Sequence, residues 1–378
     1  MEKFVVEQKS FLSLLSSMQP ICSKRTTVDA TSSILLQVGP SKELVIKSTD
    51  LEISLQASYL LHENTFNSNA AFLVNGKRLF DIVKELESDV TFVFSGNQLS
   101  LTSGNVNLAL NIADAQEFPP FPERIENLMN LNAPFFLQLL DKIAFLIPQN
   151  NANPALNGLF LEIGNDSLTM TTTDGHCLAQ IKTGKYHLEQ ARHWLMPRRA
   201  IIELKKIIES SSQEKELFLG TCGNQLVFSG ESFNFFTKVL ANPFPEYKPI
   251  LNKQGFIPAR VDRNHLVKTL RRSTCLLSGK FIATSLVFKS TSVDVSINNK
   301  EVGKLDESLP LQEFNGADLD MKFYAPYLLN GLHSFGEESL HFYLNNPARP
   351  IIFESKSNDD GCQFIYLVMP VSPSVVQN

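Results

Sequence analysis

Asp174 and His176 are the residues of this 378-residue chain whose types and spacing come nearest to a chemically active pair. They lie in the segment TTTDGHCL, residues 171–178. A carboxylate beside an imidazole can orient a general base or supply ligands to a metal ion. Either chemistry needs further groups at defined spacing, and the sequence has no HExxH, GxSxG, GxGxxG or GxxxxGK[ST] motif. We therefore expect no catalytic residue, no metal site and no cofactor, and keep a hydrolase acting through Asp174 and His176 only as a third alternative.

The same segment belongs to an internal repeat. It ends an alternating, β-branched run typical of a strand, and Asp174-Gly175 is a turn signal. Related segments occur at residues 43–50 (ELVIKSTD) and 291–298 (TSVDVSIN), so Asp50, Asp174 and Asn298 are separated by 124 residues each time (174 − 50 and 298 − 174). Because a repeated Asp is expected to cap a turn, it is a poor candidate for acid–base work.

Two further matches recur in the same order at nearly the same period. GNQL at residues 96–99 returns at 223–226, and PFPE at 120–123 returns at 243–246. Ordered matches at one period predict three copies of one domain. We place their boundaries at residues 1–124, 125–251 and 252–378, the last with a short tail at 372–378.

The composition is that of a globular protein with a substantial core, since 43% of the residues are hydrophobic and 19% are charged. No window approaches the roughly 20 apolar residues that span a membrane, and the start MEKFVVEQKS lacks an apolar signal core. We expect a cytoplasmic protein without a membrane partner. The five cysteines show no CxxC spacing, which favours reduced thiols over disulfides or a zinc site.

Apolar periodicity predicts an α+β fold in which each copy has two helices and about eight short strands. The expected helices cover residues 10–18, a segment from 76, 135–147, a segment with Pro197 at its first helical position, 264–277 and 326–335.

Several of these helices have cationic polar faces. The net charge is −5, so nucleic-acid binding would require positive charge gathered on one surface. The helix after Met196 should bury Ile201 and Leu204 and present Arg198, Arg199, Lys205 and Lys206, with Glu203 as its one acid. Helix 264–277 adds Lys268, Arg271 and Arg272. Ordinary solvated charge is the alternative for the cations chosen from helix faces.

With these motifs in place, the chain resembles the bacterial β sliding clamp family, the β subunit of DNA polymerase III. The resemblance is carried by Thr173-Asp174-Gly175-His176 followed by Leu178, by the segment FPEY at residues 244–247, and by YLVMP at 366–370. It extends from the opening KFVVE at residues 3–7 to Pro370.

The resemblance implies a non-catalytic processivity factor for the replicative polymerase. Two three-domain chains should join head to tail in a homodimeric ring whose helices line a hole around double-stranded DNA, bound without regard to sequence. An ATP-driven clamp loader should open the ring at the nucleoid, and other repair polymerases, ligase and mismatch-repair proteins should share one peptide pocket. Positions that match DNA-facing cations of the family are Arg25, Lys77, Arg78 and Arg198; Lys205, Lys206, Lys268, Arg271 and Arg272 are added from helix faces.

In the family, this pocket lies between the second and third domains and accepts a short peptide with a Gln and apolar anchors. The matching positions here are Leu156, Thr173, Gly175, His176, Leu178, Pro245, Ile250, Pro350, Leu367, Val368, Met369 and Pro370.

The chain departs from the family at three places. Cys177 and Pro249 stand where Arg is usual, and Pro154-Ala155 replaces an aromatic pair. Loss of two cations should weaken acidic contacts from the partner peptide, and loss of the aromatic pair argues against a contact to single-stranded template at residues 154–155. The alternative hypothesis is a peptide-binding adaptor of three repeats that uses the same pocket but does not encircle DNA.

Overall fold

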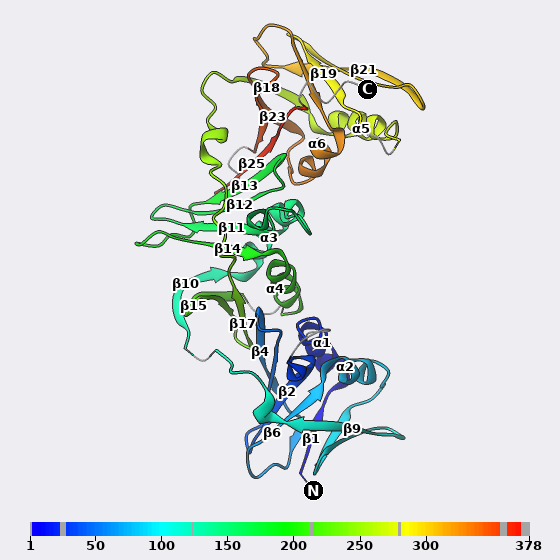
Figure 1. Cartoon of the computed structure of the whole chain (residues 1–378), viewed down its shortest axis with the longest axis vertical. Coiled ribbons are helices and arrows are strands. Elements are labelled where there is room, and N and C mark those ends of the chain that lie inside the picture. Colours follow the sequence, from blue (N-terminus) through cyan, green and yellow to red (C-terminus); the bar gives the residue numbers. More distant parts are fainter. Residues whose placement is uncertain are drawn as a thin grey trace. The chain divides into compact units, whose positions relative to one another are not determined.

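The structure is a computed structural model that describes residues 2–22, 28–122, 124–211, 215–278, 281–355 and 361–371. The chain forms two compact units: unit 1 contains residues 1–138 and 199–239, and unit 2 contains residues 139–198 and 240–378 (Figure 1). Among the described residues, no helix is both long and apolar enough to cross a membrane.

The first repeat has two helices that pack against each other, α1 (Gln8–Met18) and α2 (Gly76–Lys84). α1 buries Phe11 and Leu15, and a turn that contains Pro20 follows it, closed by a hydrogen bond from the Ile21 N–H to the Met18 carbonyl (3.1 Å). α2 begins where the Asn75 side chain accepts a hydrogen bond from the Arg78 N–H (3.0 Å), which satisfies one free amide of the first turn. The strands are β1 (Lys3–Val6), β2 (Ser33–Val38), β3 (Glu43–Thr49), β4 (Ile53–Leu60), β5 (Glu63–Asn64), β6 (Ala70–Asn75), β7 (Val90–Ser95), β8 (Gln98–Ser103) and β9 (Val106–Asp114).

The second repeat has helices α3 (Ala133–Ile143) and α4 (Arg198–Ser210). α4 buries the expected apolar residues, but it also buries Glu203. Pro197 was predicted at the first helical position and is instead the last residue of β14, opposite Gly158. β14 is the edge strand of its sheet, where the missing proline N–H leaves no ladder bond unmade. The strands are β10 (Glu126–Asn132), β11 (Gly158–Ile163), β12 (Leu168–Thr173), β13 (Cys177–Thr183), β14 (Arg192–Pro197), β15 (Glu216–Cys222), β16 (Gln225–Ser229) and β17 (Phe233–Lys238).

The third repeat has helices α5 (Arg263–Thr274) and α6 (Ala325–Leu332), which contact each other (Figure 1). The third repeat segment ends at Asn298, and a turn starts at the next residue, Asn299, whose side chain accepts a hydrogen bond from the Glu301 N–H (3.0 Å). The strands are β18 (Ile257–Asp262), β19 (Thr284–Phe288), β20 (Ser292–Asn299), β21 (Gly303–Gln312), β22 (Leu319–Phe323), β23 (Ser339–Leu344), β24 (Ile351–Glu354) and β25 (Cys362–Val368). In the described parts, the three repeats therefore have two helices each and nine, eight and eight strands.

The strands of the second repeat are shared between the units. Unit 1 has the sheet order β10-β15-β16-β17-β4-β3-β2-β6-β9-β8-β7-β1-β5, and unit 2 has β14-β11-β12-β13-β25-β24-β23-β18-β21-β20-β19-β22. Successive repeats are joined by two antiparallel pairings, β4 with β17 and β13 with β25. Each half of the second repeat thereby completes a neighbour's sheet.

Aromatic side chains fix helices to sheets within each unit. In unit 1, Phe4 stacks on Phe92 at 4.8 Å, and Phe11 of α1 meets the edge of Phe92 at 5.7 Å. In unit 2, Phe335, just after α6, packs edge-on against Phe364 of β25 at 4.9 Å. Such pairs add to the stabilisation gained by burying the rings.

Candidate peptide site and basic helix faces

The turn between β12 and β13 is held by side chains that bond to its own backbone. The Asp174 carboxylate accepts hydrogen bonds from the N–H groups of His176 (2.8 Å) and Cys177 (2.7 Å). The Thr173 hydroxyl donates to the Cys177 carbonyl (2.6 Å) and accepts from the Gly175 N–H (3.1 Å). Gly175 has φ +94°, a region that side chains disfavour. Asp174 is thus a turn cap, and the turn exposes Gly175 and His176.

The C-terminal strand lies directly beside this turn. β13 and β25 pair Leu178 with Leu367, and the Met369 N–H donates to the His176 carbonyl (2.9 Å) to extend the pairing. Val368 also pairs with Ile351, which follows Pro350 in the chain. The sequence segments 173–178 and 367–370, far apart in the chain, are therefore adjacent in space.

An apolar cluster forms on one face of this part of the sheet. Its buried members are Leu178, Tyr247, Ile352 and Leu367, and Ile250 and Met369 pack against it half-buried. The ring of Phe244 is parallel to that of Phe160 at 4.8 Å, so the segment that links the second and third repeats lies across the same face. Tyr366, the neighbour of Leu367, packs on Gly331 of α6. Because strand neighbours point to opposite faces, the cluster lies on the face turned away from α6.

The structure brings most of the predicted pocket residues together. Leu178, Ile250, Leu367 and Met369 share the cluster, and a methyl group at Gly175 would lie 3.8 Å from Leu156. Thr173, His176 and Pro350 adjoin the cluster through the turn and strand contacts given above, whereas Val368 is buried on the opposite face of the sheet, which it shares with Tyr366. Pro245 and Pro370 adjoin Phe244 and Met369 in sequence, and Pro245 is exposed.

Sequence reasoning did not include three aromatic neighbours of this patch. The His176 ring stacks on Tyr327 at 5.3 Å, and the Tyr366 hydroxyl donates to the Tyr327 carbonyl. Tyr247 is 6% exposed, and its hydroxyl donates to Glu162. Tyr247 lies inside the FPEY motif, which could have identified it, whereas no signal in the sequence ties Tyr327 to His176.

Cys177 supplies neither charge nor a nucleophile to this patch. The side chain is 1% exposed, and burial, followed by the nearby Asp174 charge, raises the pKa of the thiol to about 12. The thiol therefore stays protonated at neutral pH. No group of three His, Cys, Asp or Glu side chains among the described residues could hold a metal ion.

The predicted DNA-facing cations fall into two groups. Lys77 and Arg78 on α2 and Lys268 and Arg271 on α5 are exposed and have no ion pair within the described part of the chain. The others are partly engaged: Arg198 donates through Nε to the Ile147 carbonyl (3.0 Å), Lys206 pairs with Glu203 (3.1 Å), Arg272 pairs with Glu307, and Lys205 is half-buried. Arg25 lies outside the described residues.

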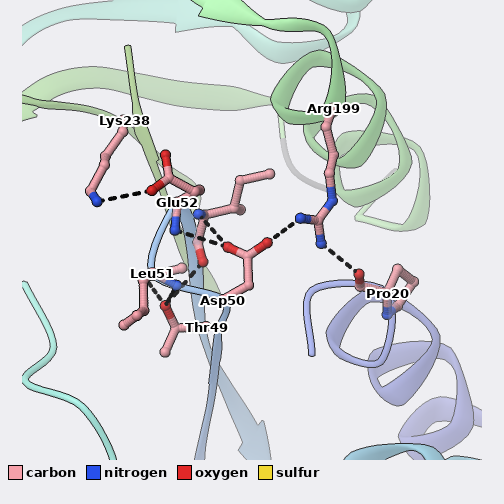
Figure 2. A network of polar contacts seen from close by, with 9 residues as sticks. Pro20, Thr49, Asp50, Leu51, Glu52, Arg199 and Lys238 are labelled. Atoms are coloured by element: carbon pink, nitrogen blue, oxygen red, sulfur yellow. Dashed lines mark hydrogen bonds and ion pairs between the residues drawn. The ribbon is translucent and has the colours of Figure 1, made fainter. Parts of the chain in front are cut away.

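The first repeat contains a second copy of the turn (Figure 2). The Asp50 carboxylate accepts from the N–H groups of Glu52 (3.0 Å) and Ile53 (2.8 Å), as Asp174 does from its own neighbours. The Lys238 N–H donates to the Glu52 carbonyl (2.9 Å), as Met369 does to His176. Leu51 takes the place of Gly175, at φ 75°.

Ion pairs cover this second copy of the turn. Arg199 pairs with Asp50 and donates to the Pro20 carbonyl (2.9 Å), and the Lys238 ammonium pairs with Glu52 (3.0 Å). Arg199 was expected to be presented on the basic face of its helix; it is exposed there, and it also makes these contacts.

Comparison with known proteins gives consistent matches along the chain. Three family models match in order: the DNA polymerase III beta subunit N-terminal domain at residues 2–122, its central domain at 130–246 and its C-terminal domain at 250–372. The beta sliding clamp of Pseudomonas aeruginosa is 26% identical over 372 residues, 97% of this chain and 99% of that protein. That of Haemophilus influenzae is 23% identical over 98% of this chain and 99% of its own length.

Solved structures share the fold. A DNA polymerase sliding clamp from P. aeruginosa has a TM-score of 0.87 at 24% identity and covers 98% of this chain and 100% of its own. A P. aeruginosa sliding clamp bound to griselimycin has a TM-score of 0.89 at 24% identity, with 98% and 99% covered. The DNA polymerase III beta subunit of Thermotoga maritima has a TM-score of 0.88 at 19% identity, with 98% and 100% covered.

Proposed function

Because the chain belongs to the DNA polymerase III beta subunit family and is a sliding clamp, a non-catalytic processivity factor, we propose how its own residues perform that task. Two copies close head to tail into a ring of six similar domains around duplex DNA, and the apolar patch around Leu178 and Leu367 holds partner peptides. The domain boundaries that accompany this proposal are residues 1–124, 125–251 and 252–378. The supporting observation is the order of the three matched domains along one chain.

Two free strand edges support the ring. β9 pairs with β8 over residues 106–111 and meets β6 only at residues 112–114. β21 pairs with β20 over residues 303–310 and meets β18 only at residues 311–312. Within the described residues, the other edge of each strand is unpaired, and Val106 and Leu108 on β9 are exposed. An edge that adds a strand from a second copy satisfies its backbone groups, and two such contacts between unlike edges close a dimer.

DNA contact is proposed for the helix cations. Lys77, Arg78, Lys268 and Arg271 are exposed and carry the main part. Arg198, Lys205, Lys206 and Arg272 contribute beside their present partners, and Arg25 is assigned by its place in the sequence. Phosphate contacts of this kind are blind to base sequence, which lets a ring slide.

Apolar and polar groups lie side by side in the proposed peptide patch. Leu178 and Leu367 offer a buried apolar floor, and half-buried Ile250 and Met369 offer contact area at the surface. Exposed His176 supplies a polar group beside them. An apolar surface with a few polar groups suits a short linear peptide. We assign to it the replicative polymerase, the clamp loader, repair polymerases, ligase and mismatch-repair proteins, acting in the cytoplasm at the nucleoid.

The decisive experiment is retention on nicked circular DNA after loading by a cognate loader with ATP. We expect the protein to stay on the circle and to leave when the circle is cut. Leu108→Arg, which places a charge on the β9 edge, should give a monomer in sedimentation and no retention. Met369→Glu should keep the dimer and the retention but lose polymerase stimulation. Equal binding to circular and linear DNA would contradict encirclement.

A peptide adaptor that does not encircle DNA is the second candidate. It is favoured by one observation, namely that the whole apolar cluster lies within unit 2 of a single chain. An adaptor would bind peptide equally well as the Leu108→Arg monomer and show no dependence on DNA topology.

A further inference from the structure

A basic cavity lies next to the apolar cluster in unit 2. Its volume is about 490 Å³, and its charged lining residues are Glu162, Lys182, Arg192 and Lys248. Three cations against one carboxylate give this lining a net charge of +2 with His193 neutral, in a chain whose net charge is −5. The cavity is therefore a local concentration of positive charge on an acidic protein.

The one carboxylate of the cavity is already neutralised. Glu162 pairs with Lys248 (3.1 Å) and accepts a hydrogen bond from the Tyr247 hydroxyl. Burial, and then this hydrogen bond to Glu162, raises the pKa of Tyr247 above its usual range, so the phenol stays protonated. Lys182 and Arg192 are exposed and have no ion pair within the described part of the chain. These two cations remain available for an anionic ligand.

The cavity and the apolar cluster share a wall and a face of the sheet. Tyr247 and Leu251 line the cavity and also belong to, or pack against, the cluster of Leu178 and Leu367. Lys182 is four residues after Leu178 on β13, so both side chains point to the same face, about 13 Å apart along the strand. An extended peptide bridges that distance with about four residues.

We propose that Lys182 and Arg192 bind acidic side chains that flank the apolar anchors of partner peptides. The inference rests on the proposed peptide patch and adds a charge requirement about four residues from the anchor over Leu178. The contact supplies positive charge at a place other than Cys177 and Pro249, the two positions where the arginine usual in the family is missing. Duplex DNA is the less favoured ligand, because the cavity opens on the sheet face turned away from α6 and none of its cations lies on an α-helix.

The test uses fluorescence polarisation with the full chain and labelled peptides. The core peptide carries one Gln and two apolar anchors. Extended versions carry Asp-Asp or Asn-Asn four to five residues beyond the anchors, on either end, and a further version carries Asp-Asp directly next to the anchors. At low ionic strength, the distant Asp-Asp pair should tighten binding roughly three- to tenfold over Asn-Asn, and 0.5 M salt should remove the difference.

Lys182→Glu with Arg192→Glu should abolish this gain and leave the core peptide unaffected. The control is Lys300→Glu, which makes one such charge reversal, half the change of the double variant, at an exposed lysine after β20. Lys182→Gln with Arg192→Gln, an uncharged and milder pair, should remove most of the gain, and thermal melts check that all variants fold.

Three outcomes would overturn the inference. One is equal binding of the distant Asp-Asp and Asn-Asn extensions. Another is a gain that survives both double variants, or that is lost equally in Lys300→Glu. The third is a double variant that reduces retention on nicked circular DNA while peptide affinities stay unchanged, which would make the cavity a nucleic-acid contact. If the core peptide itself does not bind, the proposed peptide patch is wrong and the inference falls with it. If the core peptide binds and one of the three outcomes above is found, only the inference is wrong.

Discussion

Replacing Asp50 and Asp174 by Asn in turn isolates what Arg199 contributes to the first turn. Both carboxylates accept two backbone N–H bonds, and an Asn side-chain oxygen can still accept them. Asp50 also pairs with Arg199, whereas Asp174 has no bonded cation within the described residues. The two substitutions therefore differ mainly in the ion pair.

The expected magnitudes follow from exposure. The Asp50 side chain is 7% exposed and that of Arg199 is 48% exposed, so solvent screens the pair on one side. We expect Asp50→Asn to lower the stability of unit 1 by about 1 kcal/mol and Asp174→Asn to lower that of unit 2 by less than about 0.5 kcal/mol. Asp50→Ala, which also leaves the Glu52 and Ile53 amides without an acceptor, should cost about 2–3 kcal/mol.

Hydrogen exchange is the suitable assay, because a chain of two compact units need not unfold in a single step. Peptides that contain residues 49–54 report on the first turn, and peptides that contain 173–178 report on the second. In a double-mutant cycle, the Arg199→Ala background should abolish the effect of Asp50→Asn, with a coupling of about 0.5–1 kcal/mol. Equal effects of the two Asp→Asn changes, or no coupling to Arg199, would refute the assignment of the ion pair as the closing contact.

Three further predictions concern single positions. Titration with a thiol reagent at pH 8 should modify exposed Cys275 quickly and leave Cys177 unreacted until the chain unfolds, because burial raises the pKa of Cys177 to about 12. Glu307→Gln should release Arg272 and slow escape from nicked circles. The hydrogen bond from Arg272 lowers the pKa of Glu307, so this pair stabilises the fold above the unfolded pKa of Glu307, near 4.5. The stabilisation is lost as the pH falls through the folded pKa. Thermal melts of wild type at falling pH should therefore show this loss, and melts of Arg272→Ala should not. Leu51→Gly should raise the thermal midpoint by the equivalent of about 0.5–1 kcal/mol, because the left-handed backbone conformation at φ 75° disfavours a side chain that is 42% exposed and loses little burial.

The repeat and the turn were predictable because they depend on local chemistry. An Asp at the end of a strand bonds to the amides two and three residues later wherever the chain carries it, so Asp50 and Asp174 could be assigned as caps from spacing alone. The helix faces were predictable for the same reason, since Ile201 and Leu204 follow the helical period. In the third segment the acceptor is Asn299 and not Asn298, the residue at the repeat spacing, so the period alone does not locate every cap.

The ion pairs were not predictable because they join distant segments. Arg199 and Asp50 are 149 residues apart, and Arg272 and Glu307 are 35 apart. Their geometry depends on the pairing of β4 with β17 and of β20 with β21, which no local pattern specifies. Glu203, expected as the one acid of the basic face, is buried and pairs with half-exposed Lys206. Helical periodicity thus predicted which cations lie on one face of a helix, but it could not predict which of them form ion pairs within the chain.

The two copies of the turn differ in whether a peptide anchor could bind beside them. The second turn combines Gly175, exposed His176 and half-buried Met369, so the surface beside the strand pair is apolar and open to a ligand. At the first turn, a leucine replaces the glycine, and Lys238 replaces the methionine and pairs with the glutamate that replaces the histidine. A peptide anchor at that place would have to displace the ion pairs Asp50–Arg199 and Glu52–Lys238, and an apolar anchor carries no charge that could replace them. Duplication therefore supplied the same backbone frame twice, and substitution at a few positions converted one copy into a joint and left the other available for binding.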